Sequence, residues 1–136
     1  MRRALIVLAA VLLSGCVNEG ASYMVADDPH HSISLLREQR WVWENRIEQH
    51  VVVARYPDCQ SRYDIPSGVK GSVQIELFEA RPMLYVLHQG RDWFALGTEE
   101  CRLQKFDAPP DAADLRALGS FRYQNDQLSF VAAKAQ

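Results

Sequence analysis

The 136-residue sequence has no hydrophobic run long enough to cross a membrane. Its longest unbroken apolar run, Ala4 to Leu13, covers ten residues. A helix of that length rises about 15 Å, whereas the hydrocarbon core of a bilayer is about 30 Å thick. The run is therefore too short for a transmembrane helix and needs another explanation.

Motifs of the common enzyme classes are also missing. The sequence holds no glycine-rich loop suited to cradling a phosphate and no serine in a Gly-x-Ser-x-Gly setting, and its three cysteines include no Cys-x-x-Cys pair. We therefore expect a protein that is not an enzyme and that binds no cofactor.

An excess of positive charge is lacking as well. Lys and Arg number 15 against 17 Asp and Glu, so the formal net charge is −2. The scattered charges form no basic footprint for nucleic acid and no polybasic patch that would hold the protein on anionic lipid. Nucleic acid is not an expected partner.

The N-terminus does carry a recognisable pattern. Arg2 and Arg3 precede the apolar run and small residues follow it, an order that describes a removable secretory signal. The last four residues of this pattern, Leu13-Ser14-Gly15-Cys16, resemble the lipobox of bacterial lipoproteins. The resemblance covers 16 of the 136 residues.

This resemblance implies that the chain is cleaved between Gly15 and Cys16 and that Cys16 carries a diacylglyceryl thioether. The new amine is then usually acylated too, with a chain such as palmitate, and two or more chains give stable membrane anchoring. Val17 stands where an Asp often retains such proteins in the inner membrane, so the outer membrane, facing the periplasm, is the implied location. The inner membrane and the cell surface are alternative locations. An ordinary signal peptide or an uncleaved anchor, with Cys16 an incidental thiol, is the competing interpretation.

The cysteine count fits this resemblance. If Cys16 carries lipid, Cys59 and Cys101 remain as one pair in an oxidising compartment. Their disulfide would close a loop of 43 residues, which the chain-entropy model values at roughly 4 kcal/mol. Two free buried thiols, or a redox or metal role, are the alternatives.

Three segments follow along the chain. With the lipobox resemblance, we expect residues 1–15 to be the cleaved signal peptide, residues 16–31 the lipidated N-terminus and a tether, and residues 32–136 a single β-rich periplasmic domain. The tether is inferred because residues 17–31 contain Gly20, Pro29 and no sustained periodicity.

The sequence of the first half of the domain predicts a long hairpin over residues 32–56. Apolar and polar residues alternate from Ile33 onward, and residues 47–56 are rich in β-branched side chains. Residues 44–46 supply the turn. A helix over residues 35–48 is the competing interpretation.

The second half predicts further short strands. A loop over residues 61–71 is followed by a meander, with strands at 72–80, 83–88, 92–96 and 103–106. Near the C-terminus, Asp111 is placed to cap a short helix that contains Leu115 and Leu118 and ends at Gly119. A last hairpin has strands at 120–123 and 127–132, with its turn at 124–126. The sum is a mainly β fold, an antiparallel meander forming a small sandwich or barrel with one short helix near the C-terminus.

Histidines and adjacent acids offer no convincing site. Neutral imidazoles bind zinc or copper well, but the four histidines share no paired spacing and fit solvated or packed positions better. Adjacent acids in a strand point to opposite faces, and in loops they are usually solvated. No metal is therefore expected. The residues considered are His30, His31, His50 and His88, with the acid pairs Asp27-Asp28 and Glu99-Glu100.

Aromatic residues and one arginine-bearing edge are the remaining candidates. Trp41 and Trp43 share the parity of Ile33, which favours burial of these tryptophans in the core over a face for a partner.

The run from Arg55 to Arg62 places Arg55, Tyr56 and Arg62 near the expected disulfide. Tyr and Arg are frequent in protein interfaces, so these three residues form the candidate partner surface.

The function expected from the sequence is non-catalytic. The protein would bind or scaffold a partner of the cell envelope, with its lipid in the membrane. The alternative is a carrier of a lipid or another hydrophobic ligand in a β-barrel-like pocket. A cavity lined by Trp41, Trp43 or Trp93 would favour the carrier, whereas a filled core and a flat face would favour the scaffold.

Overall fold

The computed structural model describes residues 17–134, and within them the chain is almost entirely strand and turn. The strands are β1 (Asn18–Met24), β2 (His31–Glu38), β3 (Arg46–Arg55), β4 (Cys59–Val69), β5 (Gln74–Arg81), β6 (Leu84–Gln89), β7 (Asp92–Gly97), β8 (Arg102–Lys105), β9 (Arg116–Gln124) and β10 (Gln127–Ala132). Two single-turn 3-10 helices complete the order, η1 (Val25–Asp27) and η2 (Ala112–Asp114).

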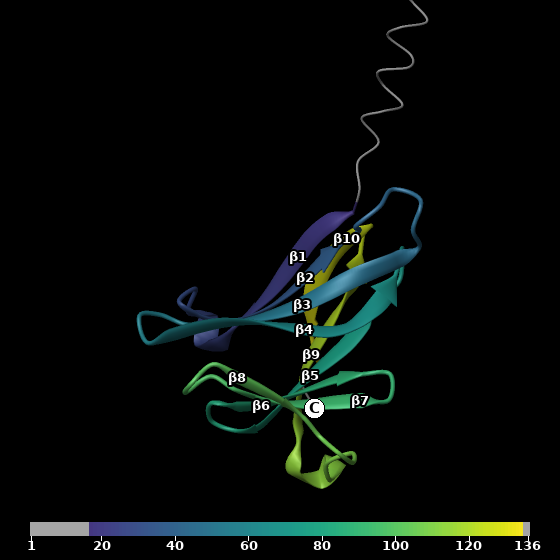
Figure 1. Ribbon diagram of the computed structural model, residues 1–136. Helices are drawn as coiled ribbons and strands as arrows, with labels where there is room; N and C mark the ends of the chain where they lie inside the picture. The colour runs from purple at the N-terminus through teal and green to yellow at the C-terminus, as the bar shows by residue number, and fades with distance from the viewer. Residues whose placement is uncertain (1–16, 135–136) are drawn as a thin grey trace, which may run out of the picture.

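The strands form two open antiparallel sheets (Figure 1). The first has the order β1-β2-β3-β4 and the second the order β10-β9-β5-β6-β7-β8. The predicted mainly β, antiparallel fold is confirmed. The sheets pack in a sandwich-like way, and neither they nor their combination closes into a barrel.

The core lies between the sheets and follows the two-residue alternation of the strands. In the first sheet, Ile33 and Leu35 of β2 lie opposite Val53 and Val51 of β3. The second sheet contributes inward-facing residues that are almost fully buried, namely Ile75, Leu77, Tyr85, Leu87, Phe94, Leu96 and Phe121. Burying each large apolar side chain contributes about 1.5–3 kcal/mol, so the space between the sheets is filled by groups that stabilise the fold.

The expectation that residues 16–31 act only as a tether is wrong for Asn18–Met24. This segment is strand β1, paired along its whole length with β2. Its inward-facing residues include Tyr23, whose ring lies 5.0 Å from that of Phe130. The other inward positions are Glu19 and Ala21, and the apolar Met24 points outward, so the apolar periodicity is too weak to read from the sequence. The folded domain therefore begins at residue 17 or 18.

The prediction of a loop at residues 61–71 is also wrong, because strand β4 continues to Val69. β4 is an edge strand, and an edge strand tolerates a proline because one side needs no amide donor. Pro66 sits where the register with β3 shifts between Ile47 and Gln49. Gly68 is required there, since a Cβ would lie 2.8 Å from the Oε1 atom of Gln49.

The short C-terminal helix is not formed. Asp111 does act as a cap, since its Oδ1 accepts a hydrogen bond from the amide of Ala113 at 3.0 Å, but only one 3-10 turn follows. From Arg116 the chain is strand β9, paired with β5 on one side and β10 on the other. Two hydrogen-bonded ladders outweigh the weak helical signal of Leu115 and Leu118.

The hairpins agree better with prediction. Strands β2 and β3 pair as expected for residues 32–56, so the helical alternative is wrong. The last hairpin turns at Asn125 and Asp126, whose φ angles of 52° and 61° are those of the left-handed region. Asn and Asp tolerate this region better than most residues, as the turn prediction assumed.

Candidate functional site

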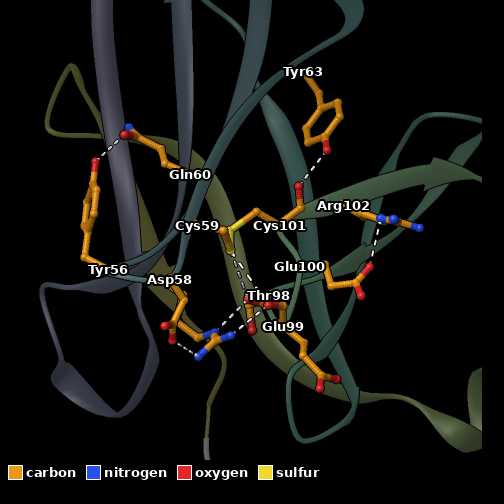
Figure 2. Close-up of a disulfide and its surroundings, with 11 residues drawn as sticks. Tyr56, Asp58, Cys59, Gln60, Tyr63, Thr98, Glu99, Glu100, Cys101 and Arg102 are labelled. Carbon is orange, nitrogen blue, oxygen red and sulfur yellow. Dashed lines mark hydrogen bonds and ion pairs between the residues drawn. A yellow bond between two sulfur atoms is a disulfide. The ribbon is translucent and has the colours of Figure 1, made fainter.

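A disulfide joins the two sheets at one end of the sandwich (Figure 2). Cys59, the first residue of β4, is bonded to Cys101 in the turn between β7 and β8, with S–S 2.01 Å and Cα–Cα 5.9 Å. The predicted pairing of these two cysteines is confirmed. The Tyr63 hydroxyl adds a hydrogen bond of 2.6 Å to the Cys101 carbonyl.

Arg55 forms a second link between the sheets beside this disulfide. Its Nε donates to the Thr98 carbonyl at 2.9 Å and its Nη2 to the Glu99 carbonyl at 2.7 Å. The remaining nitrogen, Nη1, pairs with Asp58 at 2.5 Å. The guanidinium is thus engaged within the chain, and the turn that follows β3 is held firmly against the second sheet.

The other two residues of the candidate partner surface are more open. Tyr56 is 48 % exposed, and its hydroxyl donates to Gln60. Arg62 is exposed on the outward face of β4, with its Nη2 3.6 Å from a Glu38 carboxylate oxygen. The structure therefore places Tyr56 at the disulfide end and Arg62 further along the same sheet.

His31 lies next to this region, directly opposite Arg55 in the register of β2 and β3. Burial lowers the pKa of its imidazole, and the nearby Arg55 charge lowers it further, while Asp28 acts in the opposite direction. Its Nε2 is buried and has no hydrogen-bond partner among the described residues. The side chain therefore favours its neutral form.

The opposite end of the sandwich contains a cluster that the sequence analysis missed. Arg37 is completely buried, and all five of its N–H groups have acceptors, which lie on four separate segments of the chain. Nε donates to Gln49 Oε1 at 2.9 Å, Nη1 to Glu19 Oε1 at 3.0 Å and to the Tyr123 hydroxyl at 2.6 Å, and Nη2 to the carbonyls of Val69 at 2.7 Å and Ser72 at 2.9 Å.

This cluster is a structural centre. Tyr123 also donates to the Glu19 carboxylate, and burial, together with that hydrogen bond, raises the pKa of the Tyr123 phenol. A buried charge is stable only when it is paired and fully hydrogen-bonded, and Arg37 meets both conditions. The signal was present in the sequence, because Arg37 and Gln39 share the inward parity of Ile33 and Leu35.

A cluster of three polar side chains, His50, Asp64 and Glu38, lies on the outward face of the first sheet. His50 Nδ1 lies 2.6 Å from Asp64 Oδ1, and His50 Nε2 lies 4.0 Å from Glu38. A histidine held by a carboxylate is a common arrangement in catalysis, but among the described residues no serine or cysteine is hydrogen-bonded to this imidazole. Within residues 17–134, no three potential metal ligands gather, around this histidine or any other.

The prediction that Trp41 and Trp43 are buried in the core is wrong. Trp41 and Trp43 are 47 % and 77 % exposed, in the loop between β2 and β3. Their alternation with Ile33 fails because β2 ends at Glu38 and the chain then turns. Trp93 is half-buried on the outward face of the second sheet, stacked at 3.7 Å on His88.

The depressions on the surface are small. Volumes of about 190, 180 and 350 Å³ describe three of them, and none is lined by a tryptophan. The largest crosses the outward face of β5, β9 and β10, with Gln74, Glu76, Arg122 and Lys134 among its lining residues. Its lining is mixed, because these polar and charged side chains lie beside Phe78 and Val131, so it is not the mostly apolar cavity typical of a hydrophobic-ligand site.

The chain matches no protein-family model, no curated protein sequence and no solved structure. From residue 17 to residue 134, no helix combines the length and the hydropathy needed to cross a membrane. Its function is therefore argued from its own residues.

Proposed function

We propose that the protein is a lipid-anchored module of a bacterial cell envelope, attached through Cys16 and acting as a binding or scaffolding domain rather than as an enzyme. The observation that carries this proposal is the sequence Leu13-Ser14-Gly15-Cys16 at the end of a short signal-like segment. The Cys59–Cys101 disulfide supports it, because such bonds persist in oxidising compartments. Cys16 is the one cysteine outside that bond.

The close filling of the core by side chains favours a protein that binds a partner on its surface over one that carries a ligand inside. A carrier needs an enclosed, mostly apolar cavity, typically of about 300–1,000 Å³. Here the space between the sheets is filled by side chains such as Tyr85 and Phe121, each 1 % exposed, and the depression of about 350 Å³ lies on an outward face, with charged as well as apolar side chains in its lining. These observations support the scaffold over the hydrophobic-ligand carrier.

The partner surface in this proposal follows the segment from Arg55 to Arg62, with Tyr56 at the disulfide end and Arg62 further along β4 as contact residues. Arg55 holds the turn that carries Tyr56. The chain enters β1 at the other end of the first sheet, since Asn18 pairs with Glu38 whereas Cys59 pairs with Arg55. An anchor at residue 16 would leave the disulfide end facing away from the membrane. Tyr and Arg are also the residue types that most often dominate binding energy.

Metabolic labelling with a fatty-acid analogue tests the anchor. The wild-type chain should take up the label and sediment with membranes, and Cys16→Ala should lose both properties. The double variant Cys59→Ser/Cys101→Ser is the matched control, because it removes the two disulfide-bonded cysteines but leaves the lipobox intact and should still be labelled. Label retained by Cys16→Ala would contradict the proposal.

Two further measurements test location and partner. Val17→Asp should move the labelled protein from the outer-membrane to the inner-membrane fraction. A photo-crosslinking residue at position 56 or 62 should give one adduct of defined mass, whereas the same residue at Gln127, which is exposed at the other end, should not. Arg62→Glu should weaken the adduct formed from position 56, and equal adducts from all positions would refute the proposed surface.

A further inference from the structure

The loop between β2 and β3, residues 39–45, presents an apolar surface to solvent. Six large apolar side chains are prominently exposed among the described residues, and four of them lie at this end of the first sheet: Trp41 (47 %), Val42 (52 %), Trp43 (77 %) and Val69 (50 %). The two indole rings stack with centroids 5.3 Å apart and planes 13° apart. Such contiguous exposed apolar surface marks an interaction site more often than a scattered hydrophobic residue does.

The loop keeps this shape through its own hydrogen bonds. Gln39, only 6 % exposed, donates from Nε2 to the Glu44 carbonyl at 2.6 Å and to the Val42 carbonyl at 3.3 Å. The Glu44 amide donates to the Trp41 carbonyl at 3.0 Å, which closes the turn. These hydrogen bonds fix the conformation of the loop. The two tryptophans therefore point into solvent and do not pack back onto the domain.

The base of this loop is hydrogen-bonded to the first described residue. The Gln39 amide donates to the Val17 carbonyl at 2.8 Å, and the Val17 amide donates to Gln39 Oε1 at 3.1 Å. β1 accordingly starts at the end of the molecule that carries the loop (Figure 1). Residue 16 is bonded to Val17, and consecutive Cα atoms are about 3.8 Å apart, so a lipid on Cys16 would begin one residue from the base of the loop.

Basic side chains surround the apolar loop. Arg40 lies within it, Arg46 begins β3, and Lys70 follows β4, with the Lys70 amide donating to the Asn45 carbonyl at 2.8 Å. All three are exposed, and none makes an ion pair with another residue between 17 and 134. Glu44, half-buried, is the acidic residue of the loop.

This combination is suited to a membrane interface. Tryptophan prefers the headgroup level, where its ring contacts acyl chains and its N–H meets polar groups. Basic residues near the surface add attraction to anionic lipid of about 1 kcal/mol each. Three such residues are too few to bind a membrane alone, but they need only act beside an anchor that already holds the chain there.

We infer that the Trp41-Val42-Trp43 loop enters the interface of the membrane that holds the anchor and forms a second attachment point next to Cys16. This inference rests on the proposed lipid anchor. Two attachment points fix the orientation of the domain, which a single flexible point cannot do. The loop is thus assigned a membrane-contacting role, and the occupant of its apolar surface is the lipid bilayer.

Fluorescence quenching by brominated lipid tests the inference on the full, processed chain. Trp93→Phe leaves Trp41 and Trp43 as the only tryptophans, and the matched variant Trp41→Phe/Trp43→Phe leaves only Trp93. Both proteins are purified from membranes and placed in phosphatidylethanolamine–phosphatidylglycerol vesicles, with and without bromine on the acyl chains. Fatty-acid labelling is measured on the same samples.

The expected result is a large loss of emission in brominated vesicles for Trp93→Phe and little loss for Trp41→Phe/Trp43→Phe. Labelled protein with equally small losses in both variants would overturn the membrane contact and leave the anchor standing. Protein without label would overturn the anchor, and with it this inference. Circular dichroism confirms that both variants fold, as expected for substitutions at exposed or half-buried positions.

Discussion

The Nη1 atom of Arg37 donates a hydrogen bond of 2.6 Å to the hydroxyl of Tyr123, 86 residues further along the chain. This contact joins β2 of one sheet to β9 of the other, at the end opposite the disulfide. The sandwich is thereby held at both ends, covalently at one and through a buried guanidinium at the other. The stability of the fold should depend on both.

Replacing Arg37 by Met should destabilise the protein by about 3–5 kcal/mol, the usual cost of removing one partner from a buried charged cluster. The substitution leaves the Glu19 carboxylate and the Tyr123 hydroxyl without their shared donor, together with two carbonyls. Urea unfolding measures the change. Arg122→Met, at an exposed position on β9, is the control and should cost less than about 0.5 kcal/mol. A similar small cost for Arg37→Met would show that the cluster does not stabilise the fold.

Removing the disulfide with Cys59→Ser/Cys101→Ser should cost about 4 kcal/mol, since the bond closes a loop with a sequence separation of 42 residues. Arg55 should become more important in that background, because it forms the neighbouring link between the sheets. Adding Arg55→Ala to both the wild type and the double variant tests this coupling by unfolding experiments. Equal losses in the two backgrounds would mean that the two links act independently.

Stability should fall as the pH drops below the ordinary histidine value of 6.5, in part because of His31. Burial and Arg55 lower the pKa of His31 in the folded chain, so the unfolded chain takes up this proton first as the pH decreases. The contribution is fully present above 6.5 and is lost progressively until the pH passes the lower, folded value. His31→Gln should unfold with a weaker dependence on pH between 7 and 5 (about the range in which histidine titrates). An unchanged slope would exclude His31 as a source of the effect.

Gly119→Ala should be severely destabilising, by more than about 2 kcal/mol. Gly119 has φ of 151°, and a Cβ there would lie 2.2 Å from the Val131 carbonyl oxygen and 2.9 Å from the Cα of Ala132. Backbone of the neighbouring strand β10 would have to move. Gly71→Ala is the matched control: φ is 80° but nothing lies within 4 Å of the new Cβ, so its cost should be limited to about 1 kcal/mol of backbone strain. Thermal or urea unfolding distinguishes the two, and equal effects would contradict the steric explanation.

Features with strong local signals were predicted well from the sequence. The β-branched run of β3 and the Asn125-Asp126 turn are determined by nearby residues, and the disulfide followed once Cys16 was set aside as the lipid site. Features that depend on tertiary pairing were not. β1 has little apolar periodicity and is strand because β2 offers it a partner, while β9 is strand because it lies between β5 and β10.

The candidate site was predicted only in part, for a related reason. The alternation of β2 continues in the sequence to Trp41 and Trp43, but the strand itself ends at Glu38. The same parity correctly applies to Arg37 and Gln39, which are buried polar residues. Apolar character alone does not predict burial in this protein, because a fully hydrogen-bonded arginine lies inside and two tryptophans lie outside.

The start of β1 at Asn18 sets how far the protein can reach. A lipoprotein with a long flexible spacer samples a wide volume above its membrane, but a chain anchored at Cys16 with its first strand two residues later has almost no spacer. Under the proposed anchor, its range is set by the size of the domain, in which the ten residues of β3 extend over about 33 Å. With that anchor, a partner would meet the domain close to the membrane surface, so the search for that partner should begin among proteins that stand on, or pass through, the same bilayer.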